Sequence, residues 1–279
     1  MGLALFLARL EPVRQASKTD SENAVTEELT AGVLTVTLNR PDQHNAMNPA
    51  IMAELTRIFG GLPARPDVRV VVLTGRGRSF CAGADLAFMR AAADYTFSQN
   101  VADGQAIFDL MLAVDHCPQP VVGRVNGAAI GGGAGLVSCC DIVVAVERAT
   151  FAFSEVRLGI VPAVISPFVL ARIGPGHARE LFLTGERFDA RRAQAVGLVN
   201  HVVAEEELDT AVAGRVAQLL QAAPGAQAAI KELIHTVAWR PKESVRAYTA
   251  ETIARRRASD DGREGMSAFL EKRKPRWQE

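Results

Sequence analysis

Two glycine-bearing segments supply the backbone groups with which this chain could do chemistry. One is Phe80-Cys-Ala-Gly-Ala-Asp85, and the other is Gly127-Ala-Ala-Ile-Gly-Gly-Gly-Ala-Gly135. Each is expected at a junction between a loop and a helix, where glycine leaves main-chain N–H groups uncovered and the helix dipole favours negative charge. A pair of such N–H groups can hold an oxyanion as it forms.

A single carboxylate, Glu155, follows the aromatic segment Phe151-Ala-Phe153-Ser. In an extended strand, residues 151, 153 and 155 point to the same face, so we expect Glu155 to lie beside two phenylalanine rings. Loss of hydration there would favour the neutral acid and raise its pKa toward the range useful for proton transfer. The alternative is a surface glutamate paired with Arg157. Beside two N–H donors, a buried acid would suit enolate chemistry.

The composition predicts a sizeable core and no overall charge. The chain has 279 residues, of which 48% are hydrophobic, and its 31 basic residues balance 31 acidic ones. This balance argues against binding to nucleic acid or a membrane surface, and no apolar stretch reaches transmembrane length. The four cysteines lack C-x-x-C spacing, so we expect no disulfides and a cytoplasmic location.

Several common catalytic and cofactor motifs are absent from the sequence. The glycine run fails the dinucleotide-binding pattern G-x-G-x-x-G because Leu136 occupies its last glycine position. No P-loop, G-x-S-x-G or H-E-x-x-H motif occurs, and the five histidines are widely spaced along the chain. Cys81 is expected to be a small buried hydrophobe rather than a nucleophile. We therefore expect neither a metal nor a separate cofactor.

The elements that must position these groups alternate between strand and helix in the first part of the chain. Residues 11–26 are polar and lack periodicity, so 1–25 are predicted to be a loose N-terminal arm. A core of repeated strand-strand-helix units is predicted over 26–203 and a helical module over 204–279. Asp85 is expected to cap a helix. Strands are expected at 33–38, 68–73, 121–125, 142–146 and 150–153, and helices at 50–59, 97–115, after Gly133, and at 168–172, 177–183, 190–196, 205–222, 226–236, 242–257 and 263–271.

Several separate motifs, in a fixed order, resemble the enoyl-CoA hydratase/isomerase (crotonase) superfamily. The likeness covers roughly residues 26 to 276. It is carried by Phe80-Cys-Ala-Gly-Ala-Asp-Leu86, Val125-Asn-Gly-Ala-Ala-Ile-Gly-Gly-Gly133, Cys140-Asp-Ile142, Leu158-Gly-Ile-Val-Pro162 and Arg263-Glu-Gly-Met-Ser-Ala-Phe-Leu-Glu-Lys272.

This resemblance implies an α/β fold, a spiral of β-β-α units with a C-terminal helical trimerisation region. It also implies an acyl-CoA thioester substrate and a homotrimer, or a hexamer made of two trimers. The family's oxyanion-hole amides correspond to Ala84 and Gly132, and its catalytic carboxylate to Glu155. Further residues are implied to line the substrate site: Ala82, Asp85, Leu86 and Gly135, with Phe269 and Lys272 near the CoA end and contributed across a subunit boundary.

One position departs from the two-glutamate hydratases, which carry a second glutamate where this chain has Gly135. The chain is most similar to the methylglutaconyl-CoA hydratase-like subgroup, which is associated with leucine and isoprenoid breakdown and implies a branched or carboxylated acyl group. Three functions remain open: hydration of a 2-enoyl-CoA, isomerisation with Glu155 as the single proton shuttle, or acyl-CoA binding with poor catalysis.

Overall fold

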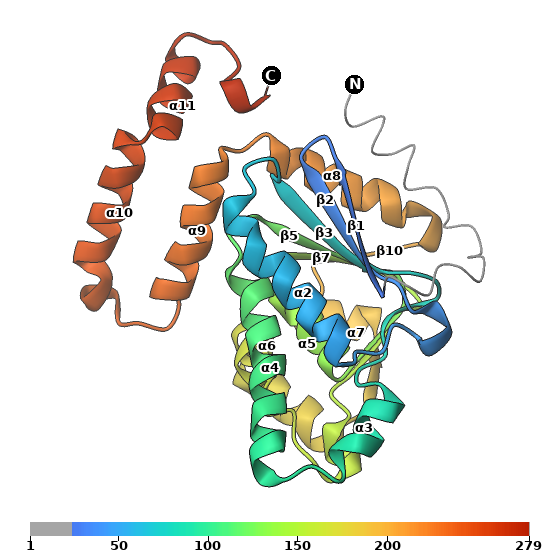
Figure 1. The fold of residues 1–279 in the computed structure, drawn as a ribbon. Coiled ribbons are helices and arrows are strands. Elements are labelled where there is room, and N and C mark those ends of the chain that lie inside the picture. Colours follow the sequence, from blue (N-terminus) through green and yellow to red (C-terminus); the bar gives the residue numbers. More distant parts are fainter. Residues whose placement is uncertain (1–23, 279) are drawn as a thin grey trace.

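A computed structural model describes residues 24–278 of the chain, so the predicted N-terminal arm lies almost wholly outside the described residues. Within that part, the larger sheet has six strands in the order β1-β2-β3-β5-β7-β10. β1 and β2 form an antiparallel hairpin, and the remaining neighbours are parallel. The strands are β1 Val25–Thr30, β2 Val33–Leu38, β3 Val70–Gly75, β5 Val121–Val125, β7 Ile142–Val146 and β10 His201–Val203 (Figure 1).

A second sheet, with four strands among the described residues, has the order β4-β6-β8-β9. Its strands are β4 Ser79–Cys81, β6 Ala128–Ile130, β8 Thr150–Ala152 and β9 Arg187–Asp189. Successive pairs along the chain, β3 with β4, β5 with β6 and β7 with β8, each give one strand to each sheet before a helix follows. This is the expected spiral of β-β-α units.

Helices cover the sheets because their apolar faces need burial. In α2 (Pro49–Gly61), Asn48 caps the N-terminus by accepting a hydrogen bond from the Ile51 N–H, and proline follows at the first helical position, as predicted. α4 (Phe97–His116) packs beside α2 (Figure 1). The other helices of the spiral are α3 Leu86–Ala92, α5 Gly132–Cys139, α6 Ser166–Thr184 and α7 Ala190–Ala195, with short 3-10 helices at Pro41–Gln43, Leu62–Ala64 and Glu155–Leu158.

The main core lies on the central parallel strands. Val70, Val71, Val72 and Leu73 are all fully buried, which explains their uninterrupted apolar run. All four cysteines are buried and free. Among residues 24–278, none of the helices combines the length and apolar character that crossing a membrane requires.

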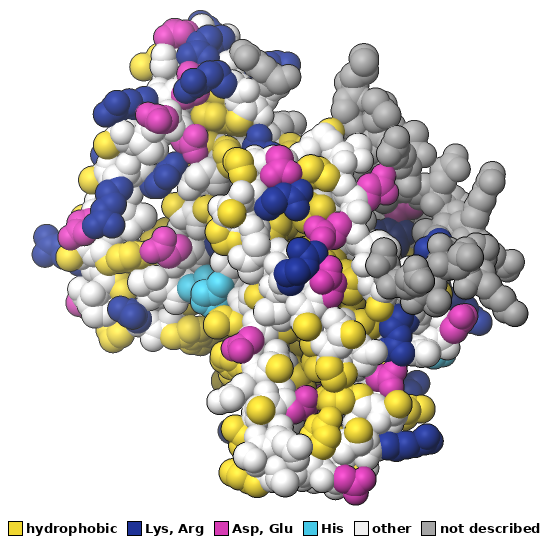
Figure 2. Space-filling model, in the orientation of Figure 1, with side chains coloured by type: hydrophobic (Ala, Val, Ile, Leu, Met, Phe, Trp, Pro, Cys, Tyr) yellow, Lys and Arg dark blue, Asp and Glu magenta, His cyan; other side chains and the backbone are white. Residues whose placement is uncertain are grey.

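After β10 the chain is helical. α8 (Leu208–Leu220) packs against the larger sheet, where Asp209 forms an ion pair of 2.6 Å with Arg124 on β5. α9 (Pro224–Val237), α10 (Arg246–Ala258) and α11 (Asp260–Leu270) then extend away from the sheets (Figure 1), and short 3-10 helices span Glu205–Glu207, Lys242–Val245 and Arg276–Gln278. In Figure 2 the region of α10 and α11, at the upper left, carries many Lys and Arg side chains.

Candidate active site

One edge of the smaller sheet positions the three residues expected to do chemistry. β4, β6 and β8 are consecutive neighbours and run parallel. Their carboxyl ends therefore meet at the same edge, where open sheets commonly place their ligand sites. Ala84 lies three residues after β4, Gly132 two residues after β6 and Glu155 three residues after β8. The topology thus brings together groups that are far apart in the sequence.

The amide of Ala84 is left free by the hydrogen bonds on either side of it. The Met47 N–H donates to the Gly83 carbonyl at 2.7 Å, and the Asp85 N–H donates to the Met47 carbonyl at 2.8 Å. These two bonds form an isolated bridge between Met47 and Ala84. Within residues 24–278 the Ala84 N–H has no hydrogen-bond acceptor, and Ala84 is exposed. Its donor is fixed in place and available to a ligand.

Gly132 presents the second amide at the start of α5. The preceding Gly131 has φ +53° and ψ −120°, a conformation that other residues avoid, and its N–H donates to the Ala152 carbonyl at 2.8 Å. Gly132 is the first helical residue, so its N–H points out of the helix without an acceptor among the described residues. A Cβ atom at Gly132 would lie 2.5 Å from the Cε of Met47. Met47, whose main chain forms the bridge to Ala84, therefore also contacts Gly132 through its side chain.

Asp85 holds in place the segment that carries the Ala84 amide. Its side chain caps α3 by accepting hydrogen bonds from the N–H groups of Ala87 (2.8 Å) and Phe88 (3.4 Å), which is the predicted role. It also forms an ion pair of 2.9 Å with Arg40. Burial opposes ionisation of Asp85, but these hydrogen bonds and Arg40 outweigh it and lower its pKa. Asp85 is therefore a charged positioning group rather than a proton donor near neutral pH.

Glu155 starts a 3-10 helix rather than ending a strand, because β8 stops at Ala152. The expected strand alternation therefore does not extend to Glu155, although the rings of Phe151 and Phe153 are both fully buried against Phe188. Burial raises the pKa of Glu155, and a hydrogen bond with its own backbone opposes this only in part.

The carboxylate of Glu155 lies next to the segment that carries the Gly132 amide. Its Oε1 atom is 3.2 Å from the position that a Cβ at Gly131 would occupy. Its Oε2 atom is buried without a hydrogen-bond partner among the described residues. A buried carboxylate oxygen without a partner is costly in a folded protein, which is typical of a group retained for function.

Apolar side chains fill the space beside Gly135, where a second glutamate would stand in a two-glutamate hydratase. A Cβ at Gly135 would lie 2.6 Å from Cγ2 of Ile165 and 3.2 Å from Cε of Met111. Ser138, one turn later, is buried and donates to the Ala134 carbonyl at 2.9 Å. Ile165 and Met111 therefore leave little room for a side chain at position 135.

Comparison with known proteins shows the family to which the chain belongs. Residues 28–279 match the family model described as enoyl-CoA hydratase/isomerase. The chain belongs to this family. It is 37% identical over 243 residues to a crotonyl-CoA hydratase of Syntrophomonas wolfei, covering 85% of this chain and 91% of the relative. It is 34% identical over 253 residues to a mevalonyl-coenzyme A hydratase of Aspergillus fumigatus, covering 89% and 92%.

The likeness extends to solved structures of the enoyl-CoA hydratase/isomerase family. The crystal structure of an enoyl-CoA hydratase from Shewanella pealeana superposes with a TM-score of 0.89 at 37% sequence identity, and the match covers 94% of this chain and all of that one. Family, fold and enzyme class are thereby established: the protein is an enzyme of the enoyl-CoA hydratase type with the crotonase fold.

The remaining predicted site residues of this family member fall into two groups. Ala82 and Leu86 lie two residues before and two residues after Ala84. The Ala82 N–H donates to the His44 carbonyl at 3.0 Å, and Leu86 is 72% exposed. Phe269 and Lys272 lie at the end of α11 and just beyond it, away from the edge that carries Ala84 (Figure 1). Within a single chain these two residues do not join the site.

Two residues that support the site were missed by the sequence analysis. Met47 is described above. Asn45 is fully buried with φ +56°, and its side chain donates to the carbonyls of Arg76 (2.9 Å) and Ser79 (2.8 Å). It ties the segment before Met47 to β4. The only hint in the sequence is an asparagine near a turn, since asparagine tolerates the left-handed conformation.

Proposed function

We propose that the protein adds water to a 2-enoyl-CoA thioester through an enolate held by the Ala84 and Gly132 amides. The observation that carries this proposal is the meeting of two unpaired N–H donors and one buried acid at a single sheet edge. Two fixed donors stabilise a developing oxyanion without reorganising, and loss of one such donor typically reduces turnover by about a hundred- to a thousand-fold.

The proposed reaction uses Glu155 for both proton transfers. The ionised carboxylate accepts a proton from water while the water oxygen forms a bond to C3. The C2=C3 electron pair shifts toward the thioester, so negative charge collects on the carbonyl oxygen between the two amides. Glu155 then returns the proton to C2 and becomes ionised again. A carboxylate with a raised pKa suits both halves of this exchange.

Isomerisation is the second candidate, and the packing at Gly135 is the observation in its favour. Ile165 and Met111 occupy the space beside this glycine, so the described residues offer no second acid to orient a water molecule there. Glu155 alone could remove a proton from one carbon and return it to another through the same enolate. The same site therefore serves both reactions, and the entry of water decides between them.

We further propose that the acyl group is branched or carboxylated, as in a methylglutaconyl-type thioester, and that the enzyme acts in leucine breakdown. The mevalonyl-coenzyme A hydratase relative, named for a branched acyl group, supports this proposal. The crotonyl-CoA hydratase relative is named for a linear acyl group and does not. We also propose a homotrimer or hexamer in which Phe269 and Lys272 reach the CoA of a neighbouring subunit. Support comes from their position on an extended helical module, where Phe269 is 83% exposed. A cytoplasmic location is part of the same proposal.

The test combines a substrate panel with isotope labelling. Linear, β-methyl-branched and carboxylated 2-enoyl-CoA thioesters are compared by kcat/KM in water enriched in ¹⁸O. Hydration predicts loss of the enoyl absorbance with one ¹⁸O atom in the product. A shifted double bond without ¹⁸O would overturn hydration in favour of isomerisation, and a higher kcat/KM for linear than for branched thioesters would overturn the acyl-group proposal.

A further inference from the structure

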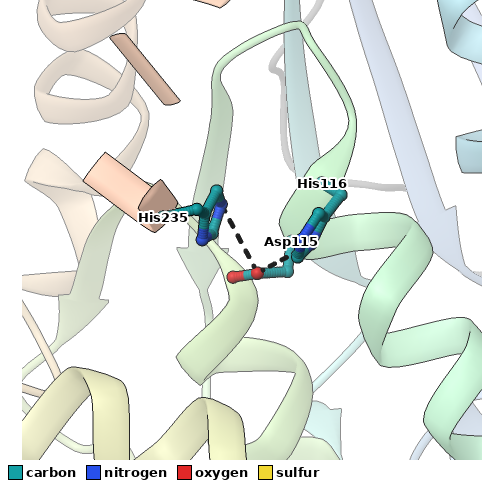
Figure 3. A group of neighbouring side chains, drawn as sticks. All are labelled: Asp115, His116 and His235. Carbon is teal, nitrogen blue, oxygen red and sulfur yellow. Dashed lines mark ion pairs between the residues drawn. The ribbon is translucent and has the colours of Figure 1, made fainter. Parts of the chain in front are cut away.

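Three side chains with metal-ligand chemistry meet at the junction between the spiral core and the helical module (Figure 3). Asp115 and His116 end α4, and His235 lies in the last turn of α9. The Asp115 Oδ2 atom is 3.1 Å from Nδ1 of His116 and 3.5 Å from Nε2 of His235. The wide spacing of the histidines in the sequence gave no indication of this cluster.

An ion pair between the buried Lys231 of α9 and the half-buried Asp141 brings His235 to this place. Lys231 lies one helical turn before His235, on the same face of the helix. Its Nζ atom is 2.7 Å from the Asp141 carboxylate and donates to the Gln119 carbonyl at 3.2 Å. The Lys231 side chain is only 10% exposed. α9 is therefore fixed against the core one turn from the cluster, and the meeting of His235 with Asp115 is a built feature rather than a chance surface contact.

We propose that Asp115, His116 and His235 form a binding site for a divalent transition metal such as Zn²⁺. Two imidazoles and one carboxylate are the donor set of many zinc sites. With metal–ligand bonds of about 2.0–2.1 Å, donors in tetrahedral geometry lie about 3.3 Å apart. The two donor separations of 3.1 and 3.5 Å match this value, and all three donor atoms lie within 4.8 Å of one another.

The two imidazole rings need one local change to accept the ion. The two imidazole rings are stacked, with centroids 4.4 Å apart and planes inclined by 13°. A metal binds in the plane of each ring, so the rings must turn apart about their side-chain bonds. The side chains of His116 and His235 are 54% and 35% exposed, which leaves space for this rotation.

The charges around the cluster are compatible with a cation. The nearest lysine, Lys231, is neutralised by Asp141, and Arg172 on α6 donates to the carbonyls of Cys140 and Asp141. The Asp115 side chain is only 21% exposed. A bound divalent ion would relieve the cost of burying this carboxylate.

The site adjoins a cavity of about 520 Å³ that is separate from the edge carrying Glu155. The cavity lies between α4, α6 and α9, and its apolar lining includes Phe108, Phe168 and Trp239. A metal here would tie α9 to α4, so we expect it to stabilise the attachment of the helical module rather than to take part in proton transfer.

Zinc titration of the full chain tests the proposal. Protein freed of metal by chelation is titrated with Zn²⁺ in a calorimeter at pH 7.5, beside His116→Ala, His235→Ala and Asp115→Asn. The wild-type chain should bind one Zn²⁺, and each variant should bind at least tenfold more weakly. His177→Ala, which removes an exposed histidine, is the matched control and should bind as the wild type does.

Thermal unfolding provides a second measurement. At a Zn²⁺ concentration of about a hundred times its dissociation constant, Tm of the wild type should rise by about 5 °C, and Tm of His235→Ala should not change. Circular dichroism without metal checks that the variants are folded. The proposal is overturned if the wild type binds no Zn²⁺ at millimolar concentration, or if His116→Ala or His235→Ala binds as tightly as the parent.

Discussion

Replacing Glu155 with glutamine separates its chemical role from its structural cost. The substitution keeps the shape of the side chain and removes its ability to exchange a proton. General acid–base catalysis contributes about 10²- to 10⁴-fold, so kcat should fall by that factor, equivalent to about 3–5 kcal/mol of activation free energy. The KM for the thioester should change little, because the two amides and the CoA contacts remain.

The same substitution should not destabilise the fold. Because burial raises the pKa of Glu155 above its ordinary value of 4.5, the folded state binds this proton more strongly than the unfolded chain does. The contribution of Glu155 to stability therefore falls as the pH rises from about 4.5 through the folded-state pKa. Glu155→Gln removes this penalty, and its Tm above pH 7 should equal or exceed that of the parent.

The assay compares kcat, KM and Tm of Glu155→Gln between pH 5 and pH 9 with those of the parent. Glu232→Gln, at an exposed glutamate on α9, is the matched control and should leave all three unchanged. Turnover of Glu155→Gln within a few-fold of the parent would refute the catalytic role. A lower Tm above pH 7 would refute the argument that the buried carboxylate is a cost to the fold.

Three further substitutions test the supports of the site and fold. Gly135→Ala places a methyl group 2.6 Å from Ile165, so the free energy of unfolding should fall by about 1–3 kcal/mol in urea titration, and no loss would contradict the packing. Asp85→Ala removes the cap of α3 and should lower the free energy of unfolding by about 1 kcal/mol. It should also lower kcat by more than tenfold, and an unchanged kcat would show that the Ala84 amide needs no such support. Lys231→Met leaves the Asp141 carboxylate, which is 31% exposed, without its cation and should lower the free energy of unfolding by about 1–3 kcal/mol. A stability equal to that of the parent would argue against a stabilising role of the ion pair.

Four of the six strands described in the larger sheet could be predicted because they are runs of β-branched and aliphatic residues, whereas β1 and β10 were not predicted. The strands at 33–38, 121–125 and 142–146 have the predicted bounds. The strands that position the site were harder to find: β4 and β6 have three residues each and lie among glycines and alanines. Such short strands are held by their neighbours rather than by local preference, so pattern alone does not reveal them.

One predicted helix break is confirmed and another is displaced. The helices predicted at 168–172 and 177–183 are separated within α6 by Gly174 (φ +73°), whose backbone is non-helical, just before Pro175. Asp260-Asp-Gly262 was predicted to separate helices but forms the first turn of α11, with Ser259 as its cap. Acidic residues are favourable in the first turn of a helix, and that preference outweighs the turn tendency of the same residues.

The sequence predicted the three residues that meet at the edge of the smaller sheet, and their catalytic roles stay a prediction; it did not predict the residues that support them. Ala84, Gly132 and Glu155 follow recognisable motifs, and the sheet order places them at one edge. Met47 and Asn45 act through a main-chain bridge and a buried amide, which depend on contacts between distant segments. No spacing rule along the chain encodes such contacts.

A crystal structure of Glu155→Gln with a bound 2-enoyl-CoA would test the central claim most directly. The thioester oxygen should lie about 2.7–3.2 Å from both the Ala84 and the Gly132 amide nitrogen, with the side chain at position 155 facing C2. A thioester oxygen that contacts neither amide, or a side chain at position 155 turned away from C2 and C3, would contradict the account.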